Sequence, residues 1–323
     1  MNRQPGPGTM KVLSSPWFAS IAPAIVGLGF STLTVLVFRD YGWSLFVLLP
    51  LLVATLSSFF WSLEPSRSFR SAFAISVLSM FLLGLMLILA AVDGAACLLM
   101  SLPLAALLSV PGVAFGQHLA RSRKRHLRTV PCLLVMSFPG VAWFESSNQA
   151  PLRMRVVTTS VAIHAPAESV WTSVIAFPPI TEKATGIFRF GFAYPMSARI
   201  EGSGVGAIRY CTFSTGSFVE PITAWVPPTL LGFDVTSCPE PMQEFSPYED
   251  LHAPHLEGYM VSHRGEFRIR PTLDGCVLEG TTWYSHSIAP SWYWAPISDY
   301  IIHRIHDRVL NHIRRNVEGS GSG

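Results

Sequence analysis

The sequence predicts a bundle of apolar, membrane-spanning helices followed by an α+β domain in which an antiparallel sheet wraps around a long C-terminal helix. Half of the 323 residues are hydrophobic and only 13% are charged, which is about half the charged share of soluble chains. The deficit lies between Val12 and Ala120, whereas the composition from Glu145 onward is ordinary. Alternating apolar segments and one long amphipathic segment fill this second part. A wholly soluble, disordered or collagen-like chain is excluded.

Four apolar stretches are each long enough to cross about 30 Å of hydrocarbon, which takes roughly twenty helical residues. They cover residues 17–38, 43–63, 72–92 and 95–119. The links at 39–42 and 93–94 are short, so neighbouring helices must be antiparallel. Apart from His118, the stretches carry no internal ionisable side chain of the kind that marks an ion path. A transporter or channel core is therefore disfavoured.

The basic residues predict the orientation of these spans. Arg3 and Lys11 precede the first stretch, Arg67 and Arg70 lie between the second and third, and a basic cluster at 121–128 follows the fourth. All three groups fall on one side if the chain starts in the cytoplasm, which is where such residues accumulate. We therefore expect an integral protein of the cell (inner) membrane, with a cytoplasmic N-terminus and no nucleic-acid partner.

The segment 130–144 is ambiguous. It is almost uncharged and follows the strongest basic cluster, which favours a short fifth span. At about fifteen residues it would be roughly 22 Å long as a helix, and Pro131, Pro139 and Gly140 weaken it further. A crossing would place the following domain outside the cytoplasm, and a re-entrant or interfacial segment would leave it inside. We favour the crossing, which completes a membrane region at 1–144.

A polar linker at 145–152 leads to a domain that we expect at 153–318, with a flexible tail at 319–323. A strand is predicted at 153–163 and a helix opens at 166–171, followed by a run of strands. These strands are expected at 196–201, 207–213, 218–226, 230–236, 258–271 and 276–286. The last segment, 291–317, reads as a long helix with an isoleucine and valine stripe every fourth residue. This order of elements predicts a sheet wrapped around the last helix.

Three motifs in this domain resemble START-like (SRPBCC) proteins, the superfamily that includes polyketide cyclases, the Bet v 1 group and lipid-transfer domains. They are VTTSVAIHAPAESVW at 157–171, GVGAIR at 204–209 and EPITAWVPPTLL at 220–231. The resemblance covers about 155–318 and not the membrane region. It implies a helix-grip fold whose sheet and last helix enclose a cavity for a lipid, sterol, polyketide or other apolar ligand. It does not fix the chemistry, because the superfamily contains binders and enzymes.

Strand alternation suggests which side chains line that cavity. On the strand at 259–269, the face that carries Tyr259, Val261, His263, Phe267 and Ile269 is predicted to point inward, away from Arg264 and Arg268. Together with positions on the neighbouring strands, the expected ligand-binding residues are Tyr210, Glu220, Ile222, Tyr259, Val261, His263, Phe267 and Tyr284. On the last strand, Thr281 and Trp283 compete with Tyr284 for the inner face.

The polar residues among them have alternative explanations. His263 is either a hydrogen-bonded core histidine or a ligand contact tuned by burial. A carboxylate in the middle of a strand must be paired, protonated or bound to ligand, and an internal pair with Arg209 is the simplest explanation for Glu220. His303 and His306 lie one turn apart and are read as packing or surface residues.

The long loop at 237–256 is typical of a lid. Its His252 and His255, with Glu249 and Asp250, lack a recognised metal spacing. No metal, cofactor or catalytic residue is predicted. A disulfide between Cys238 and Cys276 is one possibility that the sequence does not decide, because cysteine pairing cannot be read from sequence.

These features favour a membrane-anchored module that binds a lipid or other apolar small molecule for capture, transfer or sensing at the bilayer. The alternative is a cyclase/aromatase-type enzyme that uses the same cavity, with His263, Glu220 or a tyrosine as acid/base. A third possibility is a sensor domain whose ligand changes the membrane bundle. Motifs for nucleotide binding and for serine hydrolysis are absent from the sequence.

Overall fold

The chain folds as a helical part followed by an α+β part. The computed structural model describes residues 7–122, 129–148, 153–248, 254–256 and 258–320. Two compact units result. The helical unit comprises Met1–Ala150 with Glu244–Pro254 and Ile288–Tyr293, and the α+β unit comprises Pro151–Gln243, His255–Ser287 and Trp294–Gly323.

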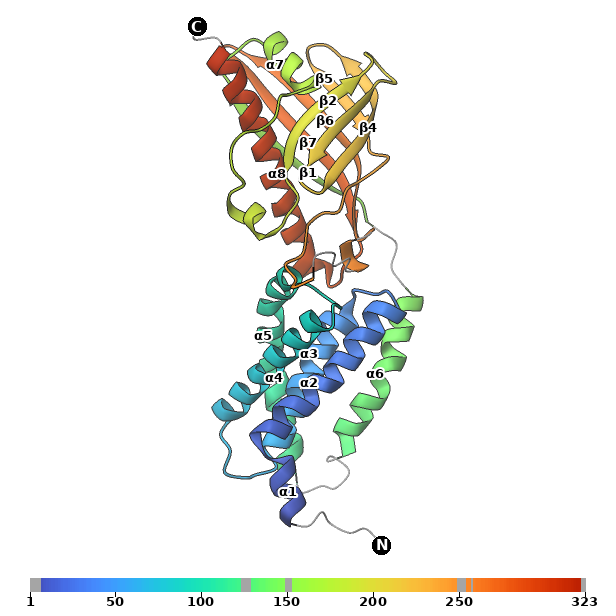
Figure 1. Cartoon of the computed structure of the whole chain (residues 1–323), viewed down its shortest axis with the longest axis vertical. Coiled ribbons are helices and arrows are strands. Elements are labelled where there is room, and N and C mark those ends of the chain that lie inside the picture. The colour runs from blue at the N-terminus through green and yellow to red at the C-terminus, as the bar shows by residue number, and fades with distance from the viewer. Residues whose placement is uncertain (1–6, 123–128, 149–152, 249–253, 257, 321–323) are drawn as a thin grey trace. The chain divides into compact units, whose positions relative to one another are not determined.

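The helical unit is built from long apolar helices (Figure 1). Its helical elements are the short α1 (Pro7–Leu13), α2 (Pro16–Thr32) with the π-helical turn η1 (Leu33–Val37), η2 (Ser44–Leu48) with α3 (Leu49–Trp61), α4 (Phe69–Leu89), α5 (Ala95–Arg121) and α6 (Val130–Ser147). Among the described residues, five segments are long and apolar enough to cross a membrane: Pro16–Val37, Ser44–Trp61, Phe69–Leu89, Ala95–Arg121 and Val130–Ser147.

Small residues allow the helices to approach closely. A Cβ atom at Gly116 of α5 would lie 2.3 Å from the Thr55 carbonyl oxygen of α3, and one at Gly112 would lie 2.8 Å from the Ala54 Cβ atom. The two helices are also joined by hydrogen bonds, because Ser58 Oγ donates to the Val113 carbonyl oxygen at 2.9 Å. Such small-residue contacts and side-chain hydrogen bonds are how helices associate in lipid, where apolar burial gives no driving force.

Helix α6 is longer than the fifteen residues that the sequence predicted. Its 18 residues give a length of about 27 Å. Its middle packs on α2, where Phe138 stacks on Phe30 with ring centroids 4.3 Å apart. Its end reaches the turn after the first apolar segment, because the backbone N–H groups of Trp43 and Ser44 donate to the Glu145 carboxylate at 2.5 and 2.8 Å.

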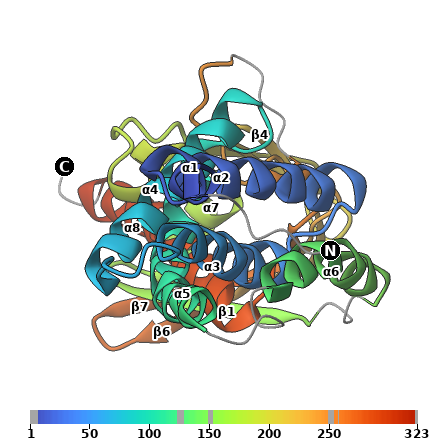
Figure 2. The same ribbon diagram turned by 90° about the horizontal axis from the view of Figure 1, so that it is seen from below.

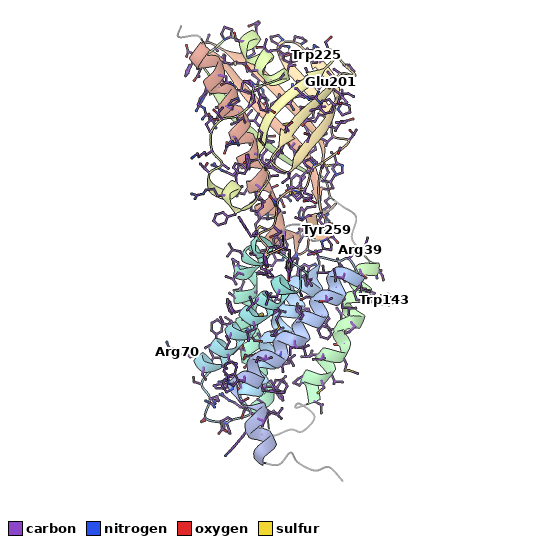
Figure 3. All side chains as sticks on the ribbon, in the orientation of Figure 1. Arg39, Arg70, Trp143, Glu201, Trp225 and Tyr259 are labelled. Atoms are coloured by element: carbon purple, nitrogen blue, oxygen red, sulfur yellow. The ribbon has the colours of Figure 1, made fainter. Side chains whose placement is uncertain are left out.

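Helix α6 lies at the edge of the helical unit. Seen along the helices, α6 lies beside α2 and α3 at the edge of the bundle (Figure 2). Arg39 and Trp143 lie at one end of this unit, and Arg70 lies toward the other (Figure 3). Helix α6 therefore runs the length of the bundle and not along one end of it.

The α+β unit is a curled, seven-stranded antiparallel sheet with a long helix (Figure 1). Its elements are β1 (Arg155–Ile163), α7 (Ala167–Ile175), η4 (Gly186–Phe190), β2 (Pro195–Glu201), β3 (Ile208–Phe213), β4 (Gly216–Val226), β5 (Leu230–Asp234), η5 (Pro254–Leu256), β6 (Met260–Thr272), β7 (Gly275–His286) and α8 (Ser291–Ser320). The strand order is β1-β7-β6-β5-β4-β3-β2.

The core of this unit lies between the sheet and the two helices. Side chains of α8 such as Val309, Leu310 and Ile313 pack with Ile163 and Leu278 of the sheet. A sheet that grips its C-terminal helix in this way confirms the predicted helix-grip fold.

The alternation predicted along β6 is wrong in its first half. A β-bulge interrupts the pairing of β6 with β7 between Ser262 and Arg264. Ser262 pairs with Tyr284 before the bulge, and Phe267 pairs with Gly280 after it. Because one extra residue shifts the side-chain phase, Val261 and His263 share a face with Ser285, opposite to Phe267. The apolar/polar pattern of a strand of this length does not reveal a bulge, so the sequence alone could not predict the change of face.

Candidate functional site

The α+β unit contains a cavity of about 90 Å³ between the inner face of the sheet and α8. Most of its wall is apolar. The apolar side chains come from β3, β4, β5 and α8, and they include Phe213, Phe218, Phe233, Ile302, Ile305 and Val309. A cavity with such walls is suited to an apolar ligand.

A buried ion pair forms part of this wall. Arg209 of β3 faces Glu220 of β4 in the strand register, and Arg209 Nη1 donates to Glu220 Oε2. Their side chains are 2% and 7% exposed, and Arg209 Nε also donates to the Ile175 carbonyl oxygen at 3.2 Å. The predicted pairing of Glu220 with Arg209 is thus confirmed. Burial raises the pKa of the Glu220 carboxyl, and the Arg209 guanidinium opposes that rise.

Aromatic rings surround the same guanidinium. The Arg209 Cζ atom lies 5.6 Å from the ring centroid of Phe233 and 5.5 Å from that of Phe267. The electron-rich faces of such rings attract a cation, more strongly where water is excluded. These rings shield the Arg209–Glu220 pair from solvent and stabilise the charged guanidinium within the apolar wall.

His306 of α8 is a second polar group on the cavity. Its Nδ1 atom lies 3.0 Å from Thr159 Oγ1, and its Nε2 atom lies 2.8 Å from Thr282 Oγ1. Burial, followed by the charge of His303, lowers the pKa of His306 to about 3. The imidazole is therefore neutral near pH 7, with one ring nitrogen donating and the other accepting.

The structure places the eight predicted ligand-binding residues in different environments. Glu220 and Phe267 line the cavity. Ile222 and Tyr284 are buried in the core, where the Tyr284 hydroxyl donates to Asp299 Oδ1 at 2.7 Å. Tyr259 precedes β6.

The other three predicted residues lie on the opposite face of the sheet. Tyr210 alternates with the cavity-lining Arg209 and Cys211, and the guanidinium of Arg199 lies 4.1 Å from its ring centroid. Val261 and His263 are turned away from α8 by the bulge. His263 is exposed, and its Nε2 atom lies 2.7 Å from Ser285 Oγ. Neither proposed role of His263, core residue or ligand contact, fits this position.

Sequence reasoning missed several lining residues. Cys211 and Phe213 follow Arg209 at alternate positions of β3, so the alternation that was applied to β6 would have found them. His306 was assigned to packing or to the surface, although Ile302 and Val309 lie one turn away on either side and also line the cavity. The helical spacing of these apolar positions was the signal that could have placed His306 on the inner face of α8.

Two further predictions concern cysteines and the long loop. All five cysteines are free, so the Cys238–Cys276 bridge that the sequence left open is not formed. The residues 249–253 of the expected lid, including His252, lie outside the described residues. Its preceding part packs in the helical unit, where the Tyr248 hydroxyl donates to the Leu89 carbonyl oxygen at 2.6 Å.

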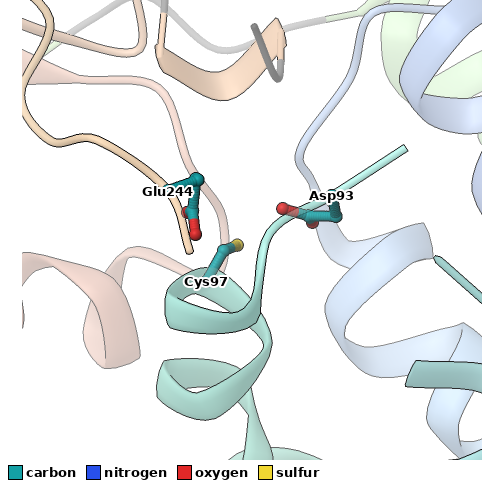
Figure 4. Close-up of side chains that lie close together, drawn as sticks. All are labelled: Asp93, Cys97 and Glu244. Atoms are coloured by element: carbon teal, nitrogen blue, oxygen red, sulfur yellow. The ribbon is translucent and has the colours of Figure 1, made fainter. Parts of the chain in front are cut away.

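The helical unit brings together three potential metal ligands that the sequence gave no reason to combine (Figure 4). One ligand atom each from Asp93, Cys97 and Glu244 lies within 4.8 Å of the others, and all three residues are buried. These are donor types that Zn²⁺ takes in proteins. Their visible role is at the start of α5, where Ala96 N–H donates to Glu244 Oε2 at 3.1 Å and Gly94 N–H to Asp93 Oδ1 at 2.8 Å.

Comparisons with known proteins found similarity in solved structures alone. No protein-family model and no curated protein matches the chain. Norcoclaurine synthase from Thalictrum flavum is 16% identical, with 54% of this chain and 99% of that chain covered and a TM-score of 0.35. Protein CV1439 from Chromobacterium violaceum is 12% identical, covers 50% and 96%, and has a TM-score of 0.32.

A third similar structure is the di-domain ARO/CYC protein StfQ from the steffimycin biosynthetic pathway. It is 10% identical, 62% of each chain is covered, and the TM-score is 0.34. The fold of the present chain is defined by its own strand order and by the position of α8.

Proposed function

We propose that this protein is a membrane-anchored START-like module that binds an apolar small molecule in the cavity between the sheet and α8. The observation that carries the proposal is the apolar cavity with a buried ion pair in its wall. Binding would capture, transfer or sense the molecule at the bilayer. Tethering to a membrane raises the concentration of the module at the lipid surface, so a modest affinity suffices.

The walls define the chemistry of the ligand. Phenyl and aliphatic side chains favour a hydrocarbon or aromatic body, whereas the Glu220 carboxylate offers a hydrogen bond to a single polar group. A cavity of about 90 Å³ is smaller than the roughly 150 Å³ apolar cavity that holds benzene. The ligand would therefore place the end of a chain here, and a ring or a larger body requires the walls to move.

Membrane anchoring is supported by the five long apolar helices. The contact of Glu145 with Trp43 and Ser44 supports α6 as the fifth span, because the turn after the first span and the end of α6 then share one side. An odd number of spans with a cytoplasmic N-terminus places the α+β domain outside the cytoplasm of an inner-membrane protein. We retain 1–144 as the membrane region, 145–152 as the linker and 153–318 as the domain, and we expect the domain expressed alone to unfold cooperatively.

Native mass spectrometry of the full chain in detergent tests ligand binding. We expect a non-covalent adduct that is retained by the wild type and lost in Ile305→Trp, which fills the cavity. Arg304→Trp is the matched control, since Arg304 is the neighbouring residue of α8 and is exposed. Val309→Phe is a milder filling variant if Ile305→Trp does not fold. An adduct that persists in both filling variants would place the ligand elsewhere.

The same experiment separates a binder from an enzyme. A binder releases its molecule unchanged after extraction and re-addition. A cyclase/aromatase-type enzyme would return a chemically altered molecule.

A further inference from the structure

We propose that the helical unit holds a second ligand site, a cavity that binds an uncharged molecule made of an apolar body and one hydroxyl group. This cavity has a volume of about 130 Å³ and is larger than the cavity of the α+β unit. The proposal does not depend on binding in the α+β unit, because all the lining residues belong to the helical unit.

The cavity lies near one end of the helices. Its walls come from the last turns of the first and third apolar segments and the first turns of the second and fourth. They include Val35, Leu45, Leu49, Leu83, Leu87 and Leu98. Leu102 also lines the cavity and is 59% exposed. If this unit spans a bilayer, an exposed leucine faces lipid tails, so a molecule dissolved in the bilayer reaches the cavity there.

Ser31 supplies the observation that points to a hydroxyl ligand. It lines the cavity and is 1% exposed, and its Oγ atom has no hydrogen-bond partner among the described residues. The neighbouring hydroxyl of Thr32 instead donates to the Leu28 carbonyl oxygen at 2.8 Å. A hydroxyl without a partner in an apolar wall is unfavourable. A ligand hydroxyl would restore the missing bond, because a serine both donates and accepts.

The remaining lining disfavours a charged ligand. Most of the lining residues are aliphatic, so an ion would lose most of its hydration there. Asp93 and Cys97 are also on the lining, but Asp93 Oδ1 already accepts the Gly94 N–H. A neutral molecule with one hydroxyl needs only the hydrogen bond that Ser31 offers.

Gly84 is the position at which the cavity can be filled. A Cβ atom there would meet only the Leu98 side chain, at 3.8 Å, so a larger side chain extends toward the lining. Gly29 of α2 has open space around a Cβ atom and is exposed. Gly29→Leu is therefore a matched control for Gly84→Leu.

Photolabelling of the full chain in detergent with a diazirine-bearing octanol tests the site. We expect saturable labelling of lining peptides from α4 and α5, which falls at least tenfold in Gly84→Leu and is unchanged in Gly29→Leu. Ala105→Phe, also on the lining, replaces Gly84→Leu if that variant does not fold. Labelling that does not saturate, or that is equal in the filling variants and the wild type, would overturn the site.

Ser31→Ala tests the class of ligand. Loss of one neutral hydrogen bond should weaken competition by unlabelled octanol roughly fivefold and leave competition by octane unchanged. The variant should also melt no lower than the wild type without ligand, because it removes an unsatisfied hydroxyl. Unchanged competition by octanol would overturn the hydroxyl ligand.

Discussion

Breaking the Arg209–Glu220 pair should destabilise the α+β unit far more than breaking an exposed pair. Both side chains are almost fully buried, at 2% and 7% exposure. Glu220→Gln or Arg209→Met leaves one charge buried without its partner, and such single deletions cost about 3–5 kcal/mol. At roughly 2–4 °C per kcal/mol for a domain of this size, the melting temperature should fall by about 6–20 °C.

The double variant Arg209→Met/Glu220→Leu separates stability from function. Replacing a buried pair with apolar side chains of similar volume is neutral or stabilising, so its melting temperature should return to that of the wild type or rise above it. If Glu220 contacts the ligand's polar group, this stable variant should nevertheless lose the adduct in native mass spectrometry.

Tryptophan emission of the detergent-solubilised chain provides the assay. The Trp171 and Trp225 rings lie in edge contact in the α+β unit, with centroids 5.5 Å apart, and report its unfolding. Arg304→Ala is the control, because the exposed Arg304–Asp307 pair contributes about 0.5 kcal/mol or less. Single variants that melt within 2 °C of the wild type, or a double variant that melts as low as the singles, would refute the reasoning.

Three more predictions follow from the site and the helices. Because the pKa of His306 is about 3 in the folded chain and about 6.5 when unfolded, the unfolded state binds the proton first as pH falls. Stability should decrease from about pH 6.5 down to pH 3, by roughly 2 kcal/mol at pH 5, and His306→Gln should remove this dependence in denaturant titrations. A reporter fused after Ala150 should give an extracytoplasmic signal, and a cytoplasmic one would exclude a fifth span. Phe267→Trp should abolish adduct retention and Val261→Trp should preserve it, whereas equal losses would contradict the bulge in β6.

The apolar helices and the positions of the strands along the chain could be predicted from the sequence, because each depends on short-range periodicity. Twenty apolar residues in succession favour a long apolar helix, and alternation with period two favours a strand. The long stripe of isoleucine and valine on α8 likewise identified the helix that the sheet grips. The Arg209–Glu220 pair was predictable for a related reason, since a carboxylate in an apolar strand must find a partner.

What the tertiary structure decided depends on residues that are distant in the chain. The bulge at Ser262–Arg264 moved Val261 and His263 off the inner face, and only pairing with β7 reveals it. The burial that lowers the pKa of His306 required the sheet to pack against α8. The cavity beside Ser31 required four helical segments to leave space between them. A sequence pattern records which face of an element is apolar, but burial and hydrogen-bond partners arise only when several such faces meet.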